Sequence, residues 1–261
     1  SKNFPNVEFE KNHLFSCDLD LLKISLKSVS NSMSSDSNRP VLNGVTFLSH
    51  HNELTFFASD GKRLSRSKVA INSNSIRESI VPFKTIHLFE RLFENTQGDV
   101  QFYSSNKSCA LEINKENLNI LCGSTLIEGI APNFENVIPD FSYFSKVKLN
   151  RGDLIKALAR IMIFNKEEVA ITSSDVLELK SILTAQNSEI LEEIKLDFDG
   201  EFSEFKSRVS SQYILDVCNS TSSDEMFIFI PSNCGKHTPL SPLMFSSMNE
   251  ESMWLILPKR V

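Results

Sequence analysis

The sequence contains no apolar run near the roughly 18 consecutive residues that a membrane-spanning helix needs. Its first ten residues, SKNFPNVEFE, lack the basic and apolar stretches of a secretory signal peptide. The composition, 41% hydrophobic and 23% charged over 261 residues, is that of an ordinary soluble globular chain. We therefore expect a cytoplasmic protein that is long enough for two domains of common size.

The sequence also lacks a CxxC pair. Its five cysteines, an odd number, lie at positions 17, 109, 122, 218 and 234, mostly in strand-like runs. Buried free thiols explain this pattern better than a disulfide framework, which indicates a reducing compartment. The net charge of −6 argues against a protein coated with basic surface, although it permits a local basic face.

The motifs of common enzyme classes are absent as well: no GxSxG elbow, P-loop, GxGxxG or HExxH occurs. The adjacent histidines His50 and His51 are expected on opposite faces of a strand, which makes them poor joint ligands of a metal ion. The neighbouring acids Glu167-Glu168 and Glu192-Glu193 are poor acid/base couples for the same reason. The sequence therefore predicts a non-catalytic protein with no metal site and no cofactor.

The elements that the sequence does predict follow a repeated order. Apolar residues recur at spacings of three and four over Asp18–Met33 and over Gly152–Phe164, and each predicts a helix. Asn150 and Asp153 resemble a capping box at the start of the second helix. Shorter helices are predicted over Pro82–Asn95, with proline in the first turn, and over Ser210–Ser220. Each of the four helices is followed by strands, so the order helix, strands, helix, strands occurs twice.

The expected strands can be read from apolar and β-branched runs. Asp60-Gly61 suits the positive φ angles of a tight hairpin between two of them. In the first half the runs are VLNGVTFL, ELTFFAS, RLSRSKVAI, DVQFYS and NLNILCG, and in the second half EVAITSS, VLELKSILTA, EILEEIKLDFD, EMFIFIP and MWLILP.

The repeat also extends to the start of the chain. Phe4-Pro5-Asn6 precedes the first unit much as Pro132-Asn133-Phe134 precedes the second. We therefore expect residues 1–9 to be the tail of a preceding domain, residues 10–139 a middle domain and residues 140–261 a C-terminal domain.

Basic residues recur on one stripe of three predicted helices. Lys23 and Lys27 are four apart, Lys84, His87 and Arg91 follow i, i+3, i+7, and Lys156 and Arg160 are again four apart. A solvated helix face explains any single stripe. Recurrence favours a shared basic surface that contacts duplex DNA through phosphates, without sequence preference, while acids such as Glu192, Glu193, Glu250 and Glu251 lie elsewhere.

Several motifs make the interpretation more specific, and they occur in this order: Arg39-Pro40-Val41-Leu42-Asn43-Gly44-Val45, Ala58-Ser59-Asp60-Gly61-Lys62-Arg63-Leu64, Ala131-Pro132-Asn133-Phe134-Glu135-Asn136-Val137-Ile138-Pro139, Tyr213-Ile214-Leu215-Asp216-Val217 and Leu257-Pro258-Lys259-Arg260-Val261. Together they resemble the bacterial β sliding clamp family, the β subunit of DNA polymerase III. The resemblance covers the second and third domains of that family. It implies an α+β fold of repeated DNA-clamp domains, each with two helices packed on antiparallel sheets, helices inside and sheets outside.

The resemblance also implies a function. Clamps of this family are homodimer rings that encircle duplex DNA and tether the polymerase III α subunit, the clamp loader and other motif-bearing proteins, which confers processivity. The apolar contact of the ring falls on Ile163 and Phe164 of this sequence; an ordinary core position is the alternative for both. Without a first domain, the alternative function is a peptide-binding scaffold that does not encircle DNA.

The family binds its partners' linear motifs in an apolar cleft between the second and third domains. By position, the cleft corresponds here to Arg39, Leu42, Ser59, Gly61, Lys62, Leu64, Pro132, Val137, Tyr213, Leu243, Leu255, Leu257, Pro258, Lys259, Arg260 and Val261. For Trp254 and Leu255, a place in the core is an equally good interpretation. Lys62 and Asn136 depart from the family pattern, so the preferred peptide is expected to differ.

Overall fold

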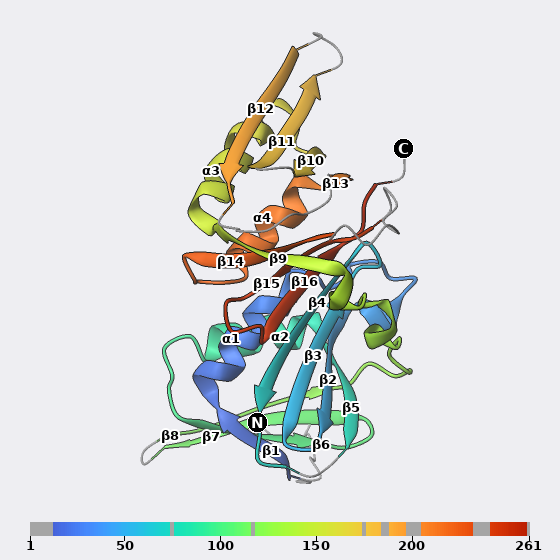
Figure 1. Ribbon diagram of the computed structural model, residues 1–261. Helices are drawn as coiled ribbons and strands as arrows, with labels where there is room; N and C mark the ends of the chain where they lie inside the picture. Colours follow the sequence, from blue (N-terminus) through green and yellow to red (C-terminus); the bar gives the residue numbers. More distant parts are fainter. Residues whose placement is uncertain are drawn as a thin grey trace. The chain divides into compact units, whose positions relative to one another are not determined.

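The computed structural model describes residues 13–73, 76–115, 118–173, 176–183, 188–196, 205–231 and 241–259. The expected segment 1–9 lies outside these residues. The chain divides into two compact units: the first ends at Phe134 and omits Lys62–Leu64, and the second consists of Lys62–Leu64 and Glu135–Val261. Figure 1 shows the helices of each unit packed against that unit's strands.

The first unit has two sheets. Strands β1 (His13–Asp18), β6 (Asp99–Ser104), β7 (Ser108–Lys115) and β8 (Leu118–Thr125) form an antiparallel sheet in the order β1-β6-β7-β8. Strands β5 (Arg77–Pro82), β2 (Gly44–His50), β3 (Glu53–Ser59) and β4 (Arg63–Ala70) are neighbours in the order β5-β2-β3-β4. Helices α1 (Leu19–Ser30) and α2 (Phe83–Leu92) pack on them, and η1 (Pro40–Leu42) is a short 3-10 turn.

The second unit repeats this order of elements. Strands β9 (Phe144–Asn150), β14 (Glu225–Pro231), β15 (Leu243–Ser246) and β16 (Ser252–Ile256) are neighbours in the order β9-β14-β15-β16. Strands β12 (Ser188–Lys195), β11 (Val176–Leu183), β10 (Val169–Ser173) and β13 (Phe205–Val209) form the other sheet. Helices α3 (Arg151–Phe164) and α4 (Ser211–Asn219) complete the unit, and η2 (Phe134–Val137) and η3 (Phe141–Tyr143) precede it.

Each unit buries its own apolar core. In the first, the Phe102 ring lies between the rings of Phe15, at 4.9 Å, and Phe47, at 5.3 Å, so aromatic packing joins the two sheets. In the second, Trp254 and Phe245 are almost fully buried in the core cluster. The predicted repeat is confirmed, because both units run strand, helix, four strands, helix, three strands.

Local sequence signals explain how the helices start. The Asp18 carboxylate accepts hydrogen bonds from the backbone N–H groups of Asp20 and Leu21, at 2.8 and 3.0 Å, and so caps α1. The Asn150 side chain accepts one from the N–H of Asp153 at 3.0 Å, as the capping pattern predicts. Pro82 differs from its predicted place: it ends β5 and occupies the N-cap of α2 rather than its first turn.

Turn geometry corrects one prediction and supports another. His50 and His51 do not face apart, because His51 and Asn52 have φ angles of 42° and 51° and turn the chain; the two imidazole rings lie 4.1 Å apart. A strand alternates its side chains only while it stays extended, and β2 ends at His50. The predicted positive φ is found at Gly61, at 85°.

Four of the five cysteines lie within the described residues. Cys17, Cys109, Cys122 and Cys218 are buried free thiols, as predicted, and Cys234 lies outside the described residues. Within the ranges described above, no helix is both long enough and apolar enough to cross a bilayer.

Candidate functional site

The last strand of the second unit belongs to its core. Trp254 is 2% exposed and Leu255 1%, which agrees with a buried place for both side chains. Trp254 and Ile256 point into the core cluster, as does Leu243 of β15. Leu255 alternates with them and is buried outside that cluster, so it offers little surface to a ligand.

Beyond β16 the chain is fixed at two points while one apolar side chain stays exposed. The N–H of Leu257 donates to the carbonyl of Lys62 at 2.9 Å, and the N–H of Lys259 donates to the carbonyl of Arg208 at 2.7 Å. Pro258 between them has no N–H to satisfy. The Leu257 side chain is 40% exposed, which leaves it available to a ligand. The other two predicted terminal residues, Arg260 and Val261, lie outside the described residues.

The Lys259 side chain adds a third attachment. Its ammonium donates to the carbonyl of Glu167 at 2.9 Å and lies 3.7 Å from the Glu168 carboxylate. Arg208 lies 4.0 Å from the same carboxylate. The terminal segment is therefore joined both to β13 and to the loop that follows α3.

A charged group beside this segment was missed by sequence reasoning. The guanidinium of Arg63 lies 2.5 Å from the Asp216 carboxylate and 4.2 Å from the centre of the Tyr213 ring. Gln212 donates to the other Asp216 oxygen at 2.8 Å. Of these residues, only Tyr213 was predicted to belong to the peptide-binding cleft. Arg63 and Asp216 lie within the motifs Ala58–Leu64 and Tyr213–Val217 that resemble the clamp family, and this position was the signal that could have identified them.

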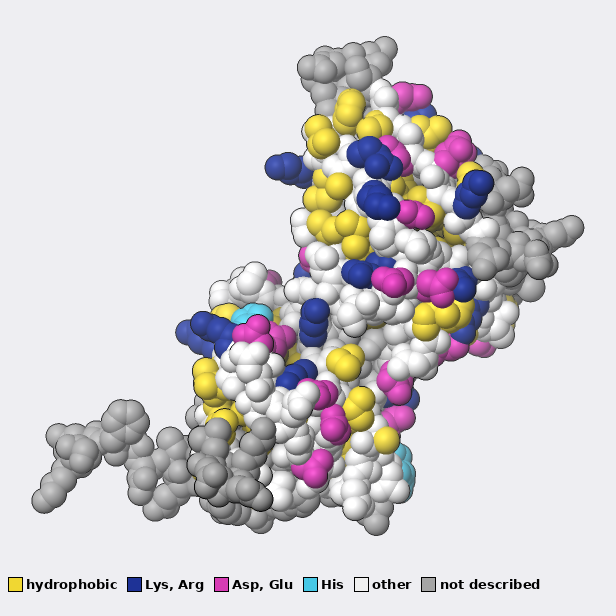
Figure 2. Space-filling model, turned by 90° about the vertical axis from the view of Figure 1, so that its left-hand side faces the viewer, with side chains coloured by type: hydrophobic (Ala, Val, Ile, Leu, Met, Phe, Trp, Pro, Cys, Tyr) yellow, Lys and Arg dark blue, Asp and Glu magenta, His cyan; other side chains and the backbone are white. Residues whose placement is uncertain are grey.

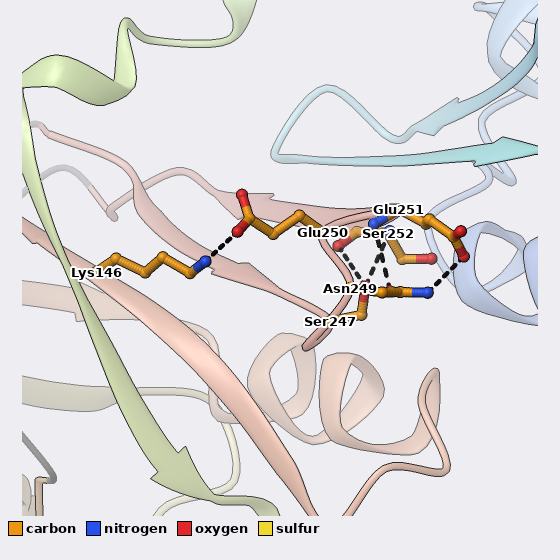
Figure 3. Close-up of polar contacts among 6 residues, drawn as sticks. All are labelled: Lys146, Ser247, Asn249, Glu250, Glu251 and Ser252. Carbon is orange, nitrogen blue, oxygen red and sulfur yellow. Dashed lines mark hydrogen bonds and ion pairs between the residues drawn. The ribbon is translucent and has the colours of Figure 1, made fainter.

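The turn before β16 holds that strand in place, as Figure 3 shows. The Ser247 hydroxyl donates to the Asn249 side chain at 2.7 Å and accepts from the Ser252 N–H at 3.0 Å. Glu250 adopts a φ of 59° and pairs with Lys146 of β9. These contacts fix where β16 begins, and therefore where Leu257 emerges.

The predicted cleft residues of the first unit form a separate group. The hydroxyl of Ser59 accepts from the N–H of Gly61 at 3.1 Å, and a Cβ on Gly61 would lie 2.7 Å from the Arg39 guanidinium. Arg39, Ser59 and Gly61 thus lie together. Leu42 is buried at 8% exposure, and Pro132 is exposed.

Two further residues of the predicted cleft, Leu64 and Val137, belong to the second unit. Leu64 is buried, and Val137 is 51% exposed.

The predicted basic stripes are uneven. Lys27, Lys84 and Arg91 are exposed and form no ion pair within the described part of the chain. Lys23 pairs with Asp20 at 2.9 Å, and Lys156 lies 3.4 Å from Asp153. Figure 2 shows Lys and Arg side chains interspersed with Asp and Glu on the face that it draws. Lys27, Lys84 and Arg91, whose charge no described carboxylate neutralises, are therefore the best candidates for phosphate contacts.

Glu192, which was expected to lie away from the basic surface, pairs with Arg160, which was predicted to face DNA. Arg160 of α3 donates from Nε and Nη2 to the two oxygens of Glu192, both at 2.6 Å. These hydrogen bonds hold the pKa of Glu192 below its usual value. The expectation for Glu192 was wrong because β12, which carries it, packs against α3.

The end of α3 presents an apolar surface. Ile163 is 79% exposed and Phe164 38%, so neither occupies the ordinary core position that was the alternative for them. Leu191 on β12, at the edge of its sheet, is 49% exposed. Large exposed apolar side chains of this kind are typical of interaction surfaces.

A metal centre has no counterpart in the ranges that the structure describes, where no three His, Cys, Asp or Glu side chains gather closely enough to hold an ion. The adjacent acids Glu167 and Glu168 both contact the Lys259 ammonium. Glu167 does so through its backbone carbonyl and Glu168 through its carboxylate, so both help to position the terminal segment.

Comparison with known proteins confirms the resemblance. Residues 17–133 match the family described as DNA polymerase III beta subunit, central domain. The beta sliding clamp of Staphylococcus epidermidis is 24% identical over 255 residues and is matched by 92% of this chain. That of Staphylococcus aureus is 25% identical over 220 residues, or 79% of this chain. The chain spans 64% and 56% of these two relatives' lengths.

Solved structures confirm the fold class. The DNA polymerase sliding clamp of Bacillus subtilis superposes with a TM-score of 0.86 at 21% identity over the whole of this chain and 68% of that one. The DNA polymerase III subunit beta of Pseudomonas aeruginosa gives 0.86 at 22% identity, over 100% of this chain and 70% of that one. The fold is therefore α+β and of the DNA-clamp type.

Proposed function

We propose that this relative of the DNA polymerase III beta subunit works as part of a sliding clamp, which holds duplex DNA and tethers replication and repair proteins through linear peptide motifs. The observation that carries the proposal is the presentation of Leu257. Its backbone is fixed by hydrogen bonds on both sides of Pro258, while its side chain remains 40% exposed. A preorganised and exposed apolar side chain suits an apolar anchor residue of a peptide.

The expected affinity is modest. Burying two apolar side chains contributes about 1.5 to 3 kcal/mol each, and ordering a flexible peptide offsets part of that, so micromolar dissociation constants are expected. Weak single contacts allow partners such as the polymerase α subunit and the clamp loader to exchange. The assignment of Arg39, Leu42, Ser59, Gly61 and Pro132 to the same cleft stays a prediction.

The test is a titration of a fluorescent polymerase-tail peptide against the chain and against a version that lacks Pro258–Val261. Micromolar binding by the intact chain and none by the truncated one is the expected result. A folded intact chain that binds no peptide would contradict the proposal.

The DNA-holding part of the proposal depends on the exposed cations of α1 and α2. Phosphate contacts from Lys27, Lys84 and Arg91 are independent of base sequence, so the protein would slide along the duplex. The alternative is a peptide-binding scaffold that never holds DNA. Charge reversal at Lys84 and Arg160 separates the two, because a clamp loses polymerase processivity while a scaffold is unaffected. Peptide affinity should not change in either case.

Ring assembly is the last part of the proposal. Ile163 and Phe164 provide exposed apolar side chains of the kind that subunit interfaces bury at their centre. In a ring-competent protein, Ile163→Ser and Phe164→Ser should each favour monomers in sedimentation velocity and leave peptide binding intact. Unchanged association by both variants would remove these residues from the interface.

A further inference from the structure

The first unit contains a pocket that neither the DNA surface nor the terminal segment uses. It has a volume of about 340 Å³ and lies between β5, the turn that joins β6 to β7, and the segment that follows β8. Arg77 and Glu78 line it from β5, Asn106 and Lys107 from the turn, and Glu128 from the segment. Its size is at the lower end of the range of ligand pockets.

The pocket lies where strand pairing along β5 stops. The carbonyl of Ile80 accepts from the N–H of Ile127 at 2.9 Å, on the side of β5 that faces away from β2. Strand residues alternate the direction of their backbone hydrogen bonds, so the N–H and C=O of Glu78 point the same way. Within the described ranges, no backbone group pairs with them.

The chain itself leaves this edge open. After Ile127 it turns away at Gly129, which adopts a φ of 133°. It returns only at Ala131, whose N–H donates to the Glu78 carboxylate at 3.1 Å. The side chain of Glu78 is therefore occupied, whereas its backbone is not, and an unpaired strand edge is a template for another extended chain.

Apolar side chains stand at both ends of the opening. Ile76 precedes Arg77 and is 65% exposed, and Ile130 follows Gly129 and is 86% exposed. These are the two most exposed large apolar side chains among the described residues of the first unit. Arg77 and Lys107 add positive charge to the lining, which also includes the carboxylates of Glu78, bound to the Ala131 N–H, and Glu128. The Arg77 guanidinium is oriented by Asn106, to which it donates at 3.1 Å.

We infer that this pocket binds an extended peptide segment of a partner protein. The segment pairs with the backbone of Glu78, packs an apolar side chain against Ile130 and directs an acidic side chain toward Arg77 and Lys107. Backbone pairing supplies affinity and the alternating side chains supply specificity, as in other cases of strand addition. This site is separate from the one at Leu257, so it would let the protein hold a second partner.

The experiment is an NMR titration of the ¹⁵N-labelled chain with a capped pentapeptide of alternating valine and aspartate. We expect saturable shifts of the Glu78, Ile80 and Ile130 amide signals. Glu78→Pro removes the outward N–H but no bond to β2, and proline is tolerated at such an edge position. It should weaken binding about tenfold, in line with the loss of backbone pairing. Glu78→Pro also removes the carboxylate that Ala131 contacts. The matched control is therefore Glu78→Ala, which loses the same contact but keeps the backbone N–H and should bind like the wild type.

Ile130→Ser is the second variant, and it tests peptide binding at the pocket if Glu78→Pro does not fold. It should weaken binding severalfold, because it changes a side chain that touches little else. No shift at Glu78 in the wild type, or equal binding by Glu78→Pro and wild type, would overturn the inference. Binding of the polymerase-tail peptide at Leu257 is measured in parallel. Absence of that binding would contradict the proposed function but would not change the result for the pocket beside β5.

Discussion

Arg63 and Asp216 form a short ion pair, 2.5 Å long, between two side chains that are only 13% and 20% exposed. The carboxylate stands on α4 and the guanidinium at the start of β4. Because the Tyr213 ring lies against the same guanidinium, the ion pair also holds that ring in place.

Asp216→Asn should therefore destabilise the protein. An uncompensated guanidinium that is mostly buried costs about 1 to 3 kcal/mol, which urea unfolding would measure. Peptide affinity should fall as well, because Tyr213 loses its fixed orientation. Asp153→Asn is the matched control: its pair with Lys156 is exposed at 60% and 69%, so it should change the stability by less than about 0.5 kcal/mol. Equal stabilities of the two variants would contradict this account.

Trp254 and Leu257 should separate folding from binding. Trp254→Ala removes a side chain that is 2% exposed and should cost about 3 to 5 kcal/mol of unfolding free energy. Leu257→Ala, at a side chain that is 40% exposed, should cost less than about 1 kcal/mol but weaken the polymerase-tail peptide about tenfold or more. A fully active Leu257→Ala protein would place the binding surface elsewhere.

Lys259 is expected to support peptide binding by holding the terminal segment in place. Lys259→Gln removes the ammonium that contacts the loop after α3, and exposed pairs of this kind contribute at most about 1 kcal/mol. The melting temperature should hardly change, whereas peptide affinity should fall about two- to fivefold because the segment is less ordered before binding. Lys156→Gln is the control. If Lys259→Gln binds as tightly as wild type, the backbone contacts alone position the segment.

Glu192 is expected to restrain DNA binding. Glu192→Gln removes the carboxylate from Arg160 and should tighten duplex binding. If the freed guanidinium contacts one phosphate, the salt dependence of log K should become steeper by about 0.9. Glu193→Gln, the neighbouring acid, is the control. Unchanged affinity and slope would show that α3 does not contact DNA.

The buried thiols should be unreactive in the native protein. Burial raises the pKa of Cys17, Cys109 and Cys218 to about 12, from an ordinary value of about 9.0. At pH 8 a thiol reagent should modify them only after urea is added. Rapid reaction of these three in the native chain, mapped by mass spectrometry, would contradict the structure.

The same pKa values predict the sign of a pH effect. The folded state holds these protons more tightly than the unfolded state, so their contribution to stability is complete below pH 9.0. It should be lost as the pH rises from 9.0 to about 12. Urea midpoints measured across this range should therefore fall, and less so in a Cys109→Ser, Cys218→Ser variant that folds.

The sequence by itself determined the features that depend on neighbouring residues. The helix starts at Asp18 and Asn150 follow from side chains that cap N–H groups within three residues. The repeated order of elements follows from the apolar periodicity, and the clamp fold from ordered motifs. The turn at His51 was missed although His and Asn are among the residues that most readily adopt positive φ angles.

The tertiary structure alone decided which distant side chains meet. Arg160 and Glu192 are 32 positions apart and pair because α3 crosses β12, and Arg63 reaches Asp216 across 153 positions. The exposure of Leu257 next to the buried Trp254 likewise depends on where β16 ends and the segment is fixed. Such pairs arise from sheet register and helix packing, whose free energy is spread over many weak contacts along the whole chain.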